Sequence, residues 1–60
     1  ADATTSYLKA IVAARTNDAS GVISNLKAAI AADKAMAKEA AIDLEFAKYA
    51  TNADFTSLVK

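Results

Sequence analysis

The stretch Tyr7–Asp33, YLKAIVAARTNDASGVISNLKAAIAAD, decides the fold of this chain. Its second half carries apolar residues at the i, i+3, i+4, i+7 and i+8 spacing of one buried helical stripe, namely Val22, Ile23, Leu26, Ala29 and Ile30. Between the two halves, Thr16, Asn17 and Asp18 are all residues that favour turns and helix caps. The stretch therefore predicts two amphipathic helices joined by a short polar turn.

The first of these helices is predicted over about 5–15 and the second over about 19–32. Thr4 or Thr5 has a hydroxyl that suits the cap of the first helix. We expect the core-facing residues of that helix to be Leu8, Ile11, Val12 and Ala14, with Lys9 and Arg15 pointing outward.

A third helix is predicted over about 34–50, with Asp33 as its cap. Its expected apolar face consists of Ala35, Ile42, Phe46 and Tyr49, widened by Met36, Ala40, Leu44 and Ala47. Glu45 and Lys48 are spaced to pair on its wet side. A short fourth helix is predicted over 53–58, behind the capping pair Thr51-Asn52, with Phe55, Leu58 and Val59 at helical spacing. Of the four aromatic residues, Tyr7 and Tyr49 are expected to be half-exposed, because a phenol reaches water while its ring packs.

Composition supports an all-α fold. Seventeen of the 60 residues are alanine, proline is absent and Gly21 is the only glycine. Short connections favour antiparallel neighbours. We therefore expect residues 1–60 to form a single small α-helical domain or fragment: an antiparallel helical hairpin plus a third, capping helix and the short fourth one.

Several classes of function are disfavoured. Seven basic and seven acidic residues cancel, so no field attracts nucleic acid or an anionic membrane. Lys or Asp interrupts every long apolar stretch, which argues against insertion into a membrane. Histidine and cysteine are absent, so no metal or cofactor is expected, and no serine has a histidine to activate it. Glu39 and Asp43, one turn apart, are interpreted as a solvated charged pair. The chain is thus expected not to be an enzyme.

The closing NLKAAIAAD resembles the end of a tetratricopeptide (TPR) repeat. Ala10 stands at the small-residue position of such a repeat's first helix, Leu26 at a large apolar position, and Ala29 at the next small one. Together with YLKAIVAARTN and DLEFAKY, the string is similar to the C-terminal end of TPR proteins common in Bacteroidetes.

This resemblance implies a TPR-like protein–protein interaction module at the C-terminal end of a longer repeat protein, with the third helix closing the stack. It implies a protein or peptide partner, bound through exposed positions of the first helix such as Lys9, Ala13 and Thr16. Export, to the periplasm or beyond, is implied by the resemblance alone. In isolation, the apolar edge on which an upstream repeat would pack is expected to allow self-association. The chain begins at Ala1 without an initiator Met, which favours the fragment interpretation.

An alternative is a self-contained three-helix bundle that acts as a surface binding module. The string AKEAAIDLEFA is similar to bacterial albumin- or immunoglobulin-binding domains of that kind.

Overall fold

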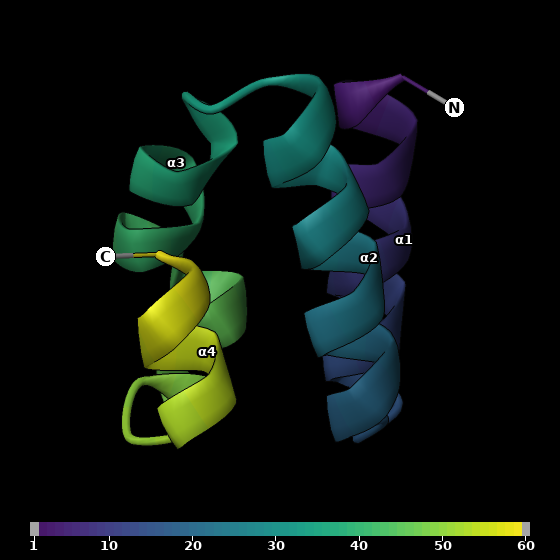
Figure 1. Ribbon diagram of the computed structural model, residues 1–60. Coiled ribbons are helices and arrows are strands. Elements are labelled where there is room, and N and C mark those ends of the chain that lie inside the picture. The colour runs from purple at the N-terminus through teal and green to yellow at the C-terminus, as the bar shows by residue number, and fades with distance from the viewer. Residues whose placement is uncertain (1, 60) are drawn as a thin grey trace.

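The computed structural model describes residues 2–59, and these form four α-helices and one 3₁₀ helix. In chain order the elements are α1 (Ala3–Arg15), α2 (Ala19–Ala32), α3 (Met36–Ile42), the 3₁₀ helix η1 (Leu44–Tyr49) and α4 (Ala53–Leu58). Within the described range there is no strand, which confirms the all-α prediction. Figure 1 shows two layers: the α1–α2 hairpin, and beside it an arm made by α3, η1 and α4.

The hairpin has a side-chain cap at the start of each helix. Asp2 Oδ1 accepts a hydrogen bond from the Thr5 backbone N–H at 2.7 Å, so α1 begins at Ala3 and the predicted threonine cap is wrong. The turn passes through Asn17, whose φ of 60° lies in the left-handed region that asparagine tolerates. Asp18 then caps α2 by accepting from the Gly21 N–H at 3.0 Å. The polar turn and the bounds of α2 agree with the prediction.

Small residues form the contact between α1 and α2. Ala10 of α1 and Val22 and Leu26 of α2 are 0% exposed. Near the turn the two helices approach so closely that a Cβ atom on Gly21 would lie 3.1 Å from the Ala13 Cβ. Residues of this size let helix axes approach to about 8 Å, the near end of the usual range.

The stripe predicted for α2 is confirmed, because Val22, Leu26 and Ala29 are buried and Ile23 and Ile30 are half-buried. The stripe predicted for α1 is wrong in part. Ala14 is buried and Ile11 half-buried as expected, but Leu8 is 56% exposed and Val12 61% exposed.

The reason lies in the close approach of the two helices. The side of α1 that faces the core carries Ser6, Ala10, Ala13 and Ala14. Leu8 and Val12 occupy the neighbouring side, and turning them toward α2 would hold the helices apart. The glycine and alanines of the hairpin therefore select the alanine side of α1.

The connection after α2 differs slightly from the prediction. Asp33 ends α2, and its Oδ1 accepts from the Ala35 N–H at 3.0 Å. This bond holds a turn, and α3 begins only at Met36. Ala35 is exposed there and does not join the core.

The third helix predicted over 34–50 is interrupted at Asp43. This residue has an extended backbone (φ −79°, ψ 125°), and its Oδ1 accepts from the Glu45 N–H at 2.9 Å, which starts η1. In a continuous helix Ile42 and Phe46 would share one face. The break separates them, so Ile42 is 82% exposed and Phe46 only 1%. Leu44, expected on the same face, is 89% exposed, so the apolar face predicted for this helix is wrong at Ile42 and Leu44.

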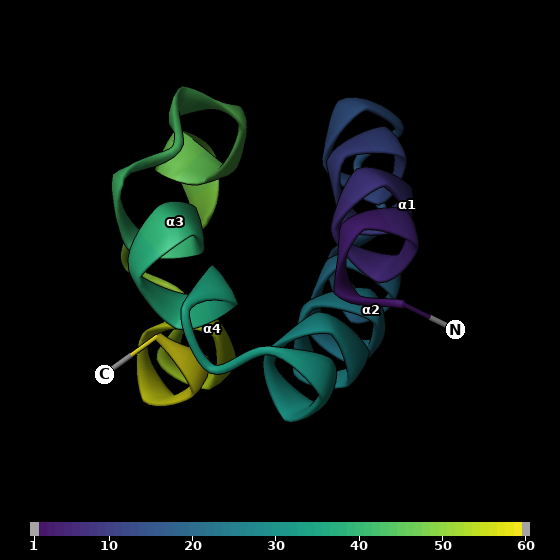
Figure 2. The same cartoon turned by 90° about the horizontal axis from the view of Figure 1, so that it is seen from above.

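Aromatic rings join the arm to the hairpin. The Phe46 ring packs edge-on against Tyr7 of α1, with centroids 5.6 Å apart, and its centroid lies 5.9 Å from that of Phe55 in α4. Phe55 is 3% exposed and Tyr49 8%, so the half-exposed position predicted for Tyr49 is wrong, whereas Tyr7 is half-buried as expected. The main core cluster includes residues of every helix, so it joins the two layers of ribbon that Figure 2 shows from above.

The fourth helix is confirmed with the predicted bounds. The Asn52 side chain accepts from the backbone N–H groups of Asp54 and Phe55, at 2.9 and 3.1 Å. Phe55 is buried, and Leu58 and Val59 are half-buried against the core. This last turn therefore closes the core from the side of the arm.

Replacing a leucine by alanine tests whether that leucine belongs to the buried core or to the exposed surface. Leu26→Ala removes a side chain that is 0% exposed, so we expect a loss of about 2–5 kcal/mol in the free energy of unfolding measured by urea melts. Leu44→Ala is the matched control, because Leu44 is 89% exposed, and should change that free energy by less than about 0.5 kcal/mol. Equal losses in the two variants would contradict the core assignment.

Candidate partner-binding face

Four large apolar side chains are exposed in the described part of the chain. Leu8 and Val12 project from α1, and Ile42 and Leu44 flank the α3–η1 break at exposures of 82% and 89%. Scattered exposed leucines are ordinary on protein surfaces, but apolar side chains gathered around a depression mark interaction sites. Whether these four side chains mark an interaction site therefore depends on whether they lie beside a hollow in the surface.

Two hollows lie between α1 and the arm. The first hollow has a volume of about 180 Å³ and is lined by Thr4, Tyr7, Leu8, Met36, Glu39 and Asp43. The second hollow, of about 340 Å³, is lined by Ala14, Arg15, Leu44, Glu45, Ala47 and Lys48. Each thus contains one of the exposed leucines. The two hollows share no lining residue and follow one another along α1, the first beside α3 and the second beside η1. We call this pair of hollows the α1–η1 groove.

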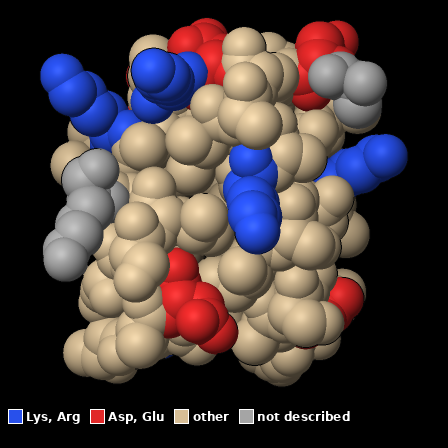
Figure 3. All heavy atoms as spheres, viewed as in Figure 1, with Lys and Arg blue, Asp and Glu red and all other residues tan. Residues whose placement is uncertain are grey.

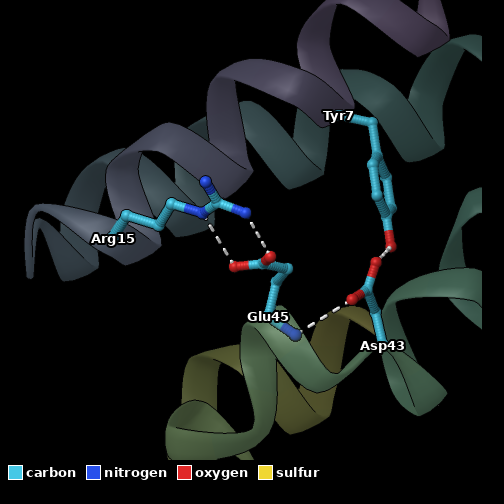
Figure 4. Close-up of polar contacts among 4 residues, drawn as sticks. All are labelled: Tyr7, Arg15, Asp43 and Glu45. Carbon is cyan, nitrogen blue, oxygen red and sulfur yellow. Dashed lines mark hydrogen bonds and ion pairs between the residues drawn. The ribbon is translucent and has the colours of Figure 1, made fainter.

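Two polar bridges cross the groove and fix its width (Figure 4). The Tyr7 hydroxyl donates to Asp43 Oδ2 at 2.6 Å. The Arg15 guanidinium donates to both carboxylate oxygens of Glu45, from Nε at 3.1 Å and from Nη2 at 2.6 Å. Both bridges join α1 to the segment at and just after the helix break, so the break places the acceptors opposite their donors.

The bridges perturb the groups that form them. Burial, and then the hydrogen bond to the Asp43 carboxylate, raise the pKa of the Tyr7 phenol well above its ordinary value of 10. The hydrogen bond from Arg15 lowers the pKa of Glu45, and the same bond raises the pKa of Arg15. The Arg15 side chain is 68% exposed, so this pair orients the arm more than it stabilises the fold.

The ion pair predicted between Glu45 and Lys48 is wrong. Glu45 is held by Arg15 from α1, and Lys48 Nζ donates instead to the Asn17 side chain in the hairpin turn. Residues three apart lie on the same side of a 3₁₀ helix as well, so the spacing does not prevent the pair; each side chain is instead engaged by a residue of the hairpin.

The three residues predicted as a partner-binding surface have different positions. Lys9 and Thr16 are exposed, and the Thr16 hydroxyl donates to the carbonyl oxygens of Val12 and Ala13 at 3.1 and 3.2 Å. Ala13 is only 7% exposed and faces α2 near Gly21, so its expected exposure is wrong. None of the three lines the α1–η1 groove.

The opposite side of the molecule has a different character. A hollow of about 470 Å³ lies between α2 and α4, and most of the residue types that line it are polar: Ala19, Ser20, Ile23, Ser24, Lys27, Asn52 and Asp54. Figure 3 shows this face as mostly uncharged surface, with a basic side chain over α2 and an acidic one over α4. None of the four exposed large hydrophobic residues lines this hollow.

The groove offers contact surface and fixed charges. The Asp43 carboxylate accepts hydrogen bonds from the Tyr7 hydroxyl and the Glu45 N–H, and Glu39 lines the first hollow beside it.

Residues 2–59 contain no group of three or more acidic, histidine or cysteine side chains placed to hold a metal ion. In the same range no helix is both long and apolar enough to cross a bilayer. Comparisons of the chain with protein-family models, curated proteins and solved structures gave no match.

Tyr7→Phe tests the first bridge. The variant loses the hydrogen bond to Asp43 but keeps the ring against Phe46, so we expect a loss of about 1 kcal/mol in the free energy of unfolding near pH 7. Because the folded pKa of Tyr7 is raised, the unfolded chain releases this proton first. The contribution is therefore complete below about pH 10 and is lost as the pH rises further.

The measurement is a set of urea melts of both proteins between neutral pH and about pH 11. The wild type should lose stability above about pH 10 more steeply than Tyr7→Phe, so that the difference between them shrinks. Parallel pH profiles would show that Tyr7 does not make this hydrogen bond in solution.

Proposed function

We propose that this protein is a non-enzymatic protein–protein interaction module that binds through the α1–η1 groove. The observation that carries the proposal is the position of Leu8 and Leu44, which are 56% and 89% exposed and lie one in each hollow. In a chain this small, large apolar side chains are scarce, and leaving them in water is unfavourable unless another surface covers them.

The polar groups of the groove support recognition rather than chemistry. The tyrosine hydroxyl and three of the charged groups, Arg15, Asp43 and Glu45, are engaged in bridges within the chain. Such bridges hold the walls of a binding surface at a fixed separation, so little ordering remains for a partner to impose. Glu39 and Lys48 stay at the surface, where charges set orientation and specificity.

The TPR-like form of the proposal is supported by the hairpin. Ala10, Leu26 and Ala29 are all 0% exposed, and these are the residues that the resemblance assigns to packing positions. We propose that the arm acts as the closing segment of such a module, at the C-terminal end of a longer repeat protein. Recognition is then passive, and the partner is a protein or peptide.

One observation favours the alternative of a self-contained bundle. The main core cluster includes residues of all five elements, from Ala10 in α1 to Phe55 in α4. A core completed by the chain's own arm suits a stand-alone surface binding module. Both forms use the same groove, so the following experiment applies to either.

Photo-crosslinking from single positions tests the proposed groove. A benzophenone amino acid replaces Leu8 or Leu44 in the protein expressed in its own cells, and Ala28, exposed on α2, serves as the matched control position. We expect discrete heavier adducts from Leu8 and Leu44 and none from Ala28, because only the first two lie in the groove.

Val12→Asp, combined with the label at Leu8, should suppress the adduct by placing a charge on the same side of α1. Adducts of equal yield from all three positions, or from none, would contradict the proposal. The mass of the adduct identifies the partner and distinguishes a second copy of the chain from another protein.

A further inference from the structure

We propose that the partner of the α1–η1 groove is a second copy of this chain, related to the first by a two-fold axis that passes through the groove. The inference rests on the proposed function of the groove as a binding surface. It is carried by the distribution of charge along the groove and by the size of the face.

The first hollow is acidic. Glu39 and Asp43 line it, and none of its lining residues in the described structure is a lysine or arginine. Tyr7 contributes only a neutral hydroxyl, which donates to Asp43 and leaves its carboxylate charged. Glu39 is exposed and forms no ion pair within residues 2–59, so it is free to meet a cation from outside.

The second hollow is basic. Arg15 and Glu45 neutralise each other in a bidentate pair, and Lys48 adds a positive charge beside them. Lys48 is exposed, and its one hydrogen bond within the described chain goes to the neutral Asn17 side chain. The groove therefore has an acidic end and a basic end.

The two ends are well separated along α1. Leu8 belongs to the acidic hollow and Arg15 to the basic one. A helix rises about 1.5 Å per residue, so these residues are about 10 Å apart along the axis. That distance is about one Debye length at physiological salt, so each end presents its own charge to a partner.

A two-fold axis suits such a groove. In an isologous interface each copy uses the same surface, so the acidic end of one copy lies against the basic end of the other. Glu39 of each copy then pairs with Lys48 of the other, and Leu8 of each copy lies against Leu44 of the other. A partner with charge of a single sign would face like charge at one of the ends. The zero net charge of the chain adds no repulsion between copies.

The size of the molecule agrees with this use of the face. A stable interface covers about 800 Å² on each partner. The accessible surface of the chain is 3808 Å², so such an interface covers about a fifth of it. One whole side of a body that measures 24 × 23 × 17 Å has about the same share of its surface. A second copy has a face of matching dimensions, whereas the hollow between α2 and α4 is lined by none of the four exposed large hydrophobic residues.

Sedimentation equilibrium of the purified 60-residue chain tests the proposal. We expect a species of twice the 6.2 kDa chain mass to accumulate as the concentration rises to about 1 mM. Leu8→Asp should leave a monomer, and the matched control Ala28→Asp, on the exposed side of α2, should dimerise like the wild type. Circular dichroism confirms that each variant keeps its helices. A wild type that remains monomeric at about 1 mM overturns the proposal.

A charge exchange tests the two-fold arrangement independently of the apolar contacts. Glu39→Lys and Lys48→Glu should each weaken the homodimer by at least about tenfold, because both symmetry-related pairs become repulsive. In an equimolar mixture of the two variants every pair is again attractive. We therefore expect the mixture to form a heterodimer of about wild-type affinity, and a mixture no more associated than its components overturns the arrangement.

These outcomes are distinct from failure of the proposed function. A chain that is monomeric by sedimentation, yet forms a crosslink from Leu8 to a different protein, contradicts the second copy as partner and retains the groove as a binding surface. Absence of both self-association and any crosslink from Leu8 contradicts both proposals.

Discussion

The packing of the Phe46 ring against Tyr7 and Phe55 is the interaction on which the rest of the structure depends. Phe46 lies in the arm and Tyr7 in the hairpin, and their rings pack edge to face with centroids 5.6 Å apart. Burial of a phenylalanine side chain contributes about 1.5–3 kcal/mol, more than a solvent-exposed ion pair provides. Phe46 therefore holds the arm on the hairpin, and the bridges that cross the groove then fix its orientation.

The small residues of the hairpin and the break at Asp43 both serve this ring. Alanines on the inner side of α1 let the helices approach, and Leu26, which is 0% exposed, closes the core from α2. The extended residue at the break turns Phe46 inward and leaves Ile42 and Leu44 in water. The same geometry thus builds the core and exposes the apolar rim of the groove, which links the fold to the proposed binding face.

How much of this could be predicted from the sequence depends on how local the cause is. The bounds and stripe of α2 follow from one unambiguous period, and the bounds of α4 follow from the Asn52 cap and the spacing behind it. In α1 two stripes compete, and only the approach of Gly21 on the other helix selects the alanines over Leu8 and Val12. The break at Asp43 is hidden among good helix formers: Asp43 caps η1 through the Glu45 N–H and also accepts a hydrogen bond from Tyr7, 36 residues earlier.

The candidate site was even less accessible to sequence reasoning. Exposure of Lys9 and Thr16 follows from their polarity, but the groove joins segments about 30 residues apart, such as Arg15 and Glu45. No local pattern marks such a pairing. Ala13 was misplaced for the same reason as the α1 stripe, since its burial is decided by α2.

The packing of Phe46 can be measured directly by a two-dimensional NOESY spectrum of the wild-type chain. The ring protons of Phe46 should show cross-peaks to those of Tyr7 and of Phe55, which lie on opposite layers of the fold. Such cross-peaks would establish that the arm is seated on the hairpin as described. Cross-peaks from Phe46 to Phe55 but none to Tyr7 or any other residue of the hairpin would contradict it.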